Sequence, residues 1–110
     1  MIVNNILAGI RHTSGTTDEQ TDTLLQHPAF ELQRIVSSGN TTPAGQWYDQ
    51  DRDEWVLVVR GRATLTFDND SALLLNPGDH VHIPAHCRHR VEWTDPQCET
   101  VWLALHYMAT

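Results

Sequence analysis

Histidine is the residue type through which this chain could do most chemistry. Seven of its 110 residues are histidines, and four of them, His80, His82, His86 and His89, lie within ten residues. Imidazole titrates near neutral pH and is the commonest metal ligand, so such a cluster suits acid–base chemistry or metal binding. His80 and His82 share strand parity and can equally lie on a solvent-facing strand without a chemical role. The surrounding elements must therefore decide which of these imidazoles meet.

Those elements are predicted to be short β-strands separated by turns. Apolar, β-prone stretches, most of them alternating with polar residues, run from 30 to 36, 55 to 59, 63 to 67, 73 to 75, 81 to 83, 89 to 93 and 101 to 107. Asp68-Asn69-Asp70 and Asn76-Pro77-Gly78-Asp79 are typical turn sequences. We expect residues 11–28 to form a loop that contains one short helical turn near Asp22. The pattern predicts an all-β barrel or sandwich, whose mouth or interior is the default ligand site.

The composition excludes several classes of function. The formal net charge is −7, and all seven basic residues are arginines that form no stripe, which argues against nucleic-acid binding. The first ten residues lack the features of a signal peptide, and no stretch approaches the roughly 20 apolar residues of a membrane span. We therefore expect a cytoplasmic protein without a membrane partner. Cys87 and Cys98 match no metal or redox spacing, and they are expected as free thiols, although the sequence leaves a disulfide between them open.

The segment from Gly78 to His89 resembles the second motif of the cupin family. That motif has Gly, five residues, Pro-x-Gly, two residues and His, and Gly78, Pro84 and His89 match it in type and spacing. His86 stands where the family usually has Gly. Upstream, the stretch Glu54–Gly61 resembles the end of the first motif, which is Glu, six residues and Gly. The two motif ends together make the chain similar to the small single-domain cupins.

The resemblance covers the chain from about Ile35 to His106 and implies a double-stranded β-helix, or jelly-roll barrel. We expect a single cupin domain over residues 1–110, with residues 1–28 as an N-terminal strand and loop arm and residues 29–110 as the barrel. Small cupins commonly pair, and four tryptophans are many for one small core to bury. A homodimer is therefore expected.

The resemblance also implies a divalent metal ion, with Zn, Ni, Fe or Mn as the candidates. In the family, two histidines and a glutamate of the first motif and one histidine of the second hold the metal. Glu54 and His89 match two of these ligand positions. The expected His-x-His pair is replaced by Tyr48 and Gln50, which share strand parity with Glu54.

A register one residue earlier would instead put Trp47 and Asp49 at the His-x-His positions. The carbonyl oxygen of glutamine is a far weaker ligand for transition metals than imidazole, and tyrosine binds well only as a phenolate, with an unperturbed pKa of about 10. A third ligand would have to come from Gln50 or His86. We therefore expect no obligatory, tightly bound metal.

Even without metal, the mouth of the barrel would hold a polar pocket. We expect its lining to include Trp47, Tyr48, Gln50, Glu54 and His89. Glu54 and His89 are the candidate catalytic residues, as a general acid–base pair, or they only hydrogen-bond to each other. The sequence thus favours a cupin that binds a small polar molecule. The alternative is a metal-dependent enzyme, of dioxygenase or isomerase type, that acts on a small polar substrate, and whether the protein is an enzyme stays open.

Overall fold

The structure is a computed structural model that describes residues 1–11 and 19–108. Its strands are β1 (Gln20–His27), β2 (Phe30–Ser37), β3 (Asp53–Arg60), β4 (Ala63–Phe67), β5 (Ala72–Leu75), β6 (His80–Ile83), β7 (His89–Thr94) and β8 (Thr100–Tyr107). Five of them form a sheet in the order β1-β2-β8-β3-β6, and three form a sheet in the order β5-β4-β7. Within the described ranges no helix is long and apolar enough to cross a membrane. The predicted all-β fold class is confirmed.

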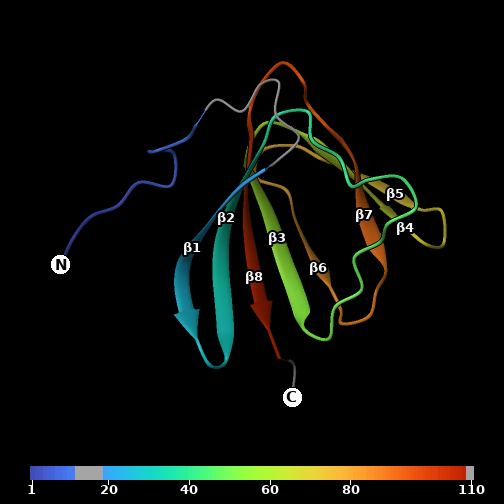
Figure 1. The fold of residues 1–110 in the computed structure, drawn as a ribbon, viewed down its shortest axis with the longest axis horizontal. Coiled ribbons are helices and arrows are strands. Elements are labelled where there is room, and N and C mark those ends of the chain that lie inside the picture. Colours follow the sequence, from blue (N-terminus) through green and yellow to red (C-terminus); the bar gives the residue numbers. More distant parts are fainter. Residues whose placement is uncertain (12–18, 109–110) are drawn as a thin grey trace.

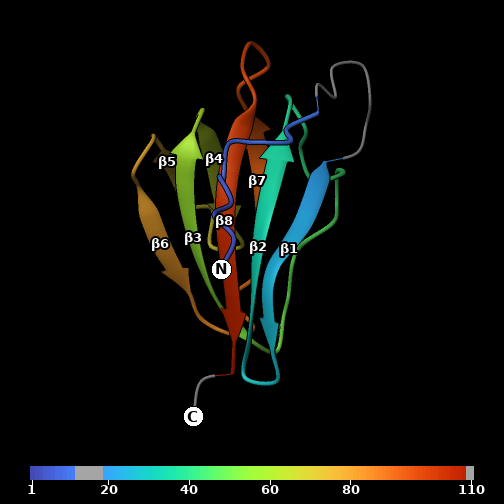
Figure 2. The ribbon, with the colours of Figure 1, turned by 90° about the vertical axis from the view of Figure 1, so that its left-hand side faces the viewer.

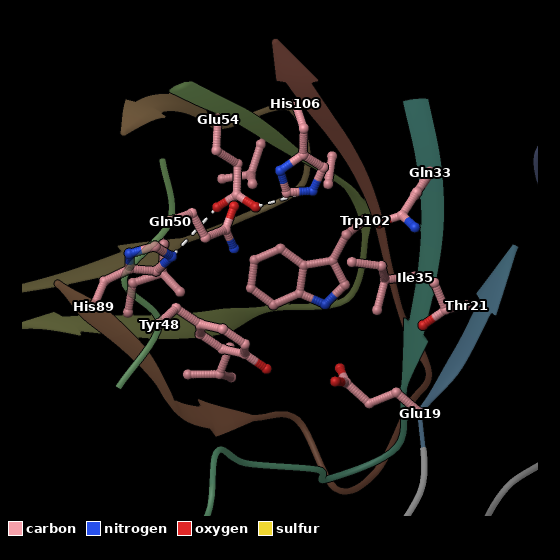
Figure 3. Close-up of a pocket in the computed structure, with 14 residues that line it drawn as sticks. Glu19, Thr21, Gln33, Ile35, Tyr48, Gln50, Glu54, His89, Trp102 and His106 are labelled. Carbon is pink, nitrogen blue, oxygen red and sulfur yellow. Dashed lines mark ion pairs between the residues drawn. The ribbon is translucent and has the colours of Figure 1, made fainter. Parts of the chain in front are cut away.

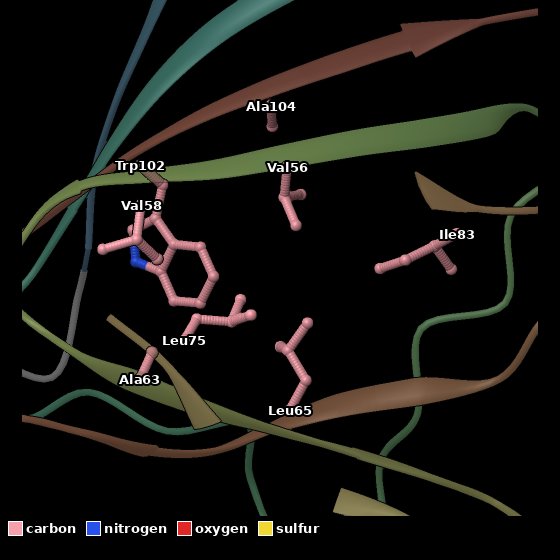
Figure 4. Packing of buried hydrophobic residues seen from close by; sticks show 8 residues of the cluster. All are labelled: Val56, Val58, Ala63, Leu65, Leu75, Ile83, Trp102 and Ala104. Carbon is pink, nitrogen blue, oxygen red and sulfur yellow. The ribbon is translucent and has the colours of Figure 1, made fainter. Parts of the chain in front are cut away.

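The two sheets face each other as layers and enclose the hydrophobic core (Figures 1 and 2). β8 lies between β2 and β3 in the larger sheet, and alternate residues of β3 and β8 point toward the smaller sheet. Figure 4 shows Val56, Val58, Trp102 and Ala104 of the larger sheet above Leu65 of β4. Val58 has no exposed surface, and the side chain of Trp102 is almost entirely buried. Each such side chain contributes about 1.5–3 kcal/mol by its burial, so this packing fixes the distance between the layers.

The segment that contains Asp22 differs from the prediction. It was expected to be a loop with a helical turn, but it forms β1, which pairs antiparallel with β2 from Gln20 opposite Val36 to the hairpin end. Threonines are common in strands, and Asp22 receives hydrogen bonds from the Arg34 guanidinium of β2, at 2.7 Å from Nη2. Pairing with a neighbouring strand therefore overrides the weak helical signal. Residues 12–18 of the predicted loop lie outside the described residues.

The passage of the chain from one sheet to the other depends on a glycine. Gly61 lies between β3 and β4 and has a φ of +84°, in the left-handed region that favours glycine. A Cβ atom at this position would lie 2.5 Å from Oγ1 and 2.6 Å from Cα of Thr100. The close approach of Thr100, at the start of β8, leaves no room for a side chain. This turn brings β4 across the core from β3.

Candidate ligand-binding site

A cavity of about 200 Å³ opens between the two sheets beside the core. One wall is apolar and includes Val56, Leu65 and Trp102. Polar groups line the same cavity, and among them Glu54 and His89 face each other across the space between the sheets (Figure 3). A cavity with an apolar wall and a few convergent polar groups is the usual form of a small-molecule site.

Strand register places the central carboxylate of this site. Glu54 of β3 pairs with His106 of β8, and residues directly opposite each other in neighbouring strands project from the same face of the sheet. Both side chains therefore point inward, where His89 reaches them from β7 of the other sheet. One oxygen of Glu54 lies 3.3 Å from Nε2 of His89, and the other lies 3.3 Å from Nε2 of His106. All three side chains are about nine-tenths buried, so the contacts form in a setting of low dielectric.

The hydrogen bonds of His89 favour the charged form of its imidazole, in which both ring nitrogens carry a proton. Its Nδ1 lies 2.8 Å from the carbonyl oxygen of Cys87, which can only accept, so Nδ1 is the donor. Its Nε2 faces the Glu54 carboxylate and donates as well. Burial lowers the pKa of His89, but the bonds to Glu54 and to the Cys87 carbonyl outweigh it and raise the pKa above its usual value. The site therefore favours the charged form of His89 beside the Glu54 carboxylate.

The segment before β3 brings Tyr48 and Gln50 to the same cavity. Backbone hydrogen bonds of 2.7 and 3.1 Å join Tyr48 to His89 as an isolated bridge, and their ring centroids lie 5.6 Å apart. Burial and the negative charges of Glu19 and Glu54 raise the pKa of the Tyr48 phenol, against an opposing hydrogen bond with Thr42. The phenol therefore keeps its proton near neutral pH.

Four of the five residues predicted for the pocket line this cavity, namely Tyr48, Gln50, Glu54 and His89. Trp47 differs, because it does not belong to the lining. It lies beside Arg88, whose guanidinium carbon is 5.4 Å from its ring centroid. Successive residues of an extended segment point to opposite sides, so the neighbour of an inward Tyr48 is turned away from the cavity.

His86, considered as a third metal ligand, lies outside the cavity that holds Glu54 and His89. Its ring is exposed and its Nδ1 lies 2.9 Å from a carboxylate oxygen of Asp49. The residue has a φ of +62°, so it adopts the left-handed conformation that the family's glycine would supply. The turn therefore forms without glycine, and it places the His86 imidazole at the rim of the cavity.

The donor set does not fit the metal that the resemblance implied. In the described part of the chain, no three His, Cys, Asp or Glu side chains are placed to hold one metal ion. The two inward imidazoles each contact a different oxygen of Glu54, rather than converging on a common point. The two remaining positions carry a protonated phenol at Tyr48 and an amide at Gln50, which are weak partners for transition metals.

His106 is the main site residue that the sequence interpretation did not assign. It extends the inward series of β8, after Trp102 and Ala104, with the same two-residue spacing. A polar residue at the end of an apolar strand face was the available signal. Glu19 and Gln33 also line the cavity, but they come from a segment and a strand to which no motif pointed.

Comparisons with known proteins agree with this architecture. The family model described as cupin domain matches residues 36–106. A crystal structure from Ralstonia eutropha JMP134, of a protein named a "putative mannose-6-phosphate isomerase", is 43% identical, with a TM-score of 0.92 and coverage of 99% of this chain and 100% of that one. A search of curated proteins finds no match.

More distant structures share the fold. A cupin superfamily protein from Desulfitobacterium hafniense DCB-2 is 20% identical with a TM-score of 0.75, over 91% of this chain and 84% of that one. An RmlC-like cupin protein from Desulfovibrio desulfuricans is 15% identical with a TM-score of 0.70, over 96% of both chains. These likenesses support the jelly-roll architecture.

Proposed function

This chain belongs to the cupin family, and on that premise we propose that it binds a compact, polar, non-phosphorylated small molecule without an obligatory metal ion. The observation that carries the proposal is the inward group of Glu54, His89 and His106 beside the apolar wall of Trp102. A ligand with a polar edge and an apolar face complements both sides of the cavity. The proposal places this binding protein in the cytoplasm, as expected from the sequence.

The volume of the cavity limits the size of the ligand. At about 200 Å³, it has room for roughly six or seven water molecules of about 30 Å³ each. This suits a molecule of about the size of a monosaccharide or smaller, whereas a nucleotide or a peptide would extend far beyond it.

Charge argues against a phosphorylated ligand. Of the residues that the structure describes, the carboxylates Glu19 and Glu54 line the cavity and no arginine does, and the chain has no lysine. Phosphate groups are usually bound by arginine or lysine side chains or by a helix N-terminus. The Ralstonia protein carries the name of an isomerase of a sugar phosphate, but a phosphate on that sugar would lack a cationic side chain here except His89, which is already paired with Glu54. We therefore propose the unphosphorylated class of ligand.

A second candidate function is proton transfer on the bound molecule. A carboxylate that contacts two imidazoles can move a proton between neighbouring atoms of a substrate, as an isomerisation requires. Glu54 would act as the base and one imidazole as the acid. Conversion of a hexose to its isomer would be the reaction to assay.

Binding can be tested with three forms of one hexose. D-mannose is neutral, D-mannosamine is largely cationic at about pH 6.5, and D-mannose 6-phosphate is anionic. At a tenfold excess over its Kd, a ligand adds about 1.4 kcal/mol of stability, which raises the Tm of a domain of this size by several degrees. We expect such a shift in EDTA-containing buffer with the first two sugars and none with the phosphate.

A cavity-blocking variant locates the binding. Gln33 lines the cavity at its open side, so Gln33→Trp should abolish the shift. Gln97→Trp introduces the same residue at an exposed turn far along the chain and is the matched control. A shift that survives Gln33→Trp, or one that appears only after metal is added, would contradict the proposal.

A further inference from the structure

One buried ring nitrogen of the site has no hydrogen-bond partner among the described residues. The side chain of His106 is only 8% exposed, and its Nε2 lies 3.3 Å from Glu54. Its Nδ1 is buried and makes no hydrogen bond to any described residue. A buried polar atom without a partner is costly, and its presence in a native structure usually has a reason. Because His106 lines the cavity, the missing partner can be a ligand.

The neighbouring hydrogen bonds decide whether Nδ1 of His106 is a hydrogen-bond donor or an acceptor. The Glu54 carboxylate accepts hydrogen bonds from Nε2 of His106 and from Nε2 of His89, and it favours the charged form of His89. In a neutral imidazole one ring nitrogen donates and the other accepts. Because Nε2 of His106 faces a carboxylate, which can only accept, the ring proton lies on Nε2 and Nδ1 presents a bare lone pair.

We propose that Nδ1 of His106 accepts a hydrogen bond from a hydroxyl or ammonium group of the ligand and so selects ligands that bring a donor to this point. The inference rests on the proposed function and deepens it. An ionised carboxylate or phosphate oxygen can only accept hydrogen bonds. It could not pair with Nδ1, which is itself an acceptor. The residue acts as a binding and specificity-determining group.

The position of His106 between two hollows supports this role. It lines the inner cavity and also the wider, open hollow at the mouth, together with Gln33 and Gln50. The mouth carries the carboxylates of Glu31, Asp49 and Asp51, and its arginine, Arg52, is engaged by Glu31 at 3.7 Å. This negatively charged mouth would repel an entering anion but not a neutral or cationic donor.

Two substitutions of His106 test the roles of its two ring nitrogens separately. In His106→Gln, the amide can occupy the place of Nε2 and still donate to Glu54, but nothing replaces Nδ1. In His106→Asn, the amide oxygen can occupy the place of Nδ1, but the contact with Glu54 is lost. We expect His106→Gln to weaken mannose or mannosamine binding about tenfold or more, and His106→Asn to retain more of it. Comparison of the ligand affinities of the two variants distinguishes ligand recognition from a purely structural role.

Nuclear magnetic resonance of the ring nitrogens of the ¹⁵N-labelled protein tests the premise without any ligand. We expect His106 to show a protonated Nε2 and a bare Nδ1, and His89 to show two protonated nitrogens. Saturation with D-mannosamine or D-mannose should shift the Nδ1 resonance of His106. A free protein in which Nδ1 of His106 is protonated would overturn the inference.

The possible failures are distinguishable. If the sugars bind the wild type, are blocked by Gln33→Trp and bind His106→Gln with unchanged affinity, the inference about His106 is wrong and the proposed function stands. If the phosphorylated sugar binds best, the donor selection is wrong. If none of the three sugars binds the wild type, the proposed function fails for this ligand class and the inference fails with it.

Discussion

Replacing Glu54 by glutamine tests whether the buried ion pair is the electrostatic centre of the site. The substitution keeps the size of the side chain and one acceptor oxygen but removes the charge that faces His89 and His106. Because the pKa of His89 is raised in the folded protein, its charged form stabilises the fold fully below the unfolded pKa of about 6.5. That contribution is lost as the pH rises through the folded pKa.

The expected loss of stability therefore depends on pH. Near pH 6, Glu54→Gln leaves a buried imidazolium without its counter-charge, and loss of one partner of a buried pair costs about 3–5 kcal/mol. The glutamine oxygen still accepts one hydrogen bond, so we expect the lower end, about 3 kcal/mol. Above the folded pKa of His89 its imidazole is neutral, and the loss falls toward that of a single hydrogen bond, about 1 kcal/mol. The sign follows because, once the carboxylate is gone, burial lowers the pKa of His89 and only the hydrogen bond to the Cys87 carbonyl still raises it.

Urea unfolding followed by tryptophan fluorescence, at several pH values between about 5 and 8, measures this difference. Glu92→Gln is the matched control, because Glu92 is an exposed carboxylate of β7 that pairs with Arg90 of the same strand. This substitution should change the free energy of unfolding by no more than about 1 kcal/mol at any pH. A loss for Glu54→Gln that is the same at both ends of the range would refute the ion pair.

Three further predictions concern the turn, the metal and the assembly. Gly61→Ala should cost more than about 3 kcal/mol of unfolding free energy, because its Cβ would overlap Thr100, whereas Gly45→Ala, with a similar φ of +80° and open space, should cost only about 1–2 kcal/mol; equal losses would exclude the steric explanation. Elemental analysis of untagged protein purified without chelators should find metal well below one equivalent, and any that binds should disappear in His89→Ala but not in His80→Ala; one equivalent that survives dialysis against EDTA would contradict this. Light scattering at micromolar concentration should give twice the chain mass of 12.5 kDa, and a monomer mass would refute the expected homodimer.

The fold was predictable because its signals are local. Alternation along residues 63–67 and the turn after Asn76 each depend on a few neighbouring residues, and the structure has strands and a turn there. β1 was missed because its partner lies across a hairpin and its own sequence is polar. Its stability comes from pairing with β2 and from the bond between Asp22 and Arg34, which a local pattern does not contain.

The candidate site was predictable only where a motif marked it. Glu54 and His89 lie at motif ends, and the structure brings them to 3.3 Å. His106 depends on the register between β3 and β8, and a register cannot be read from either strand alone. The direction of Trp47 depends on which side of an irregular segment faces inward, and the sequence does not fix that parity where no regular strand is formed.

The partners of Glu54 explain how this barrel can hold a buried carboxylate without a metal ion. A carboxylate removed from water needs an opposing charge and hydrogen-bond donors, or it takes up a proton. In the family pattern, a metal and its histidines would meet that need. Here Tyr48 and Gln50 occupy the two upstream positions, while His89 supplies the charge and His106, from the adjacent strand, supplies the second donor. The second imidazole thus contacts the carboxylate directly, and the ring nitrogen that this leaves bare faces a cavity of the size of a small polar ligand.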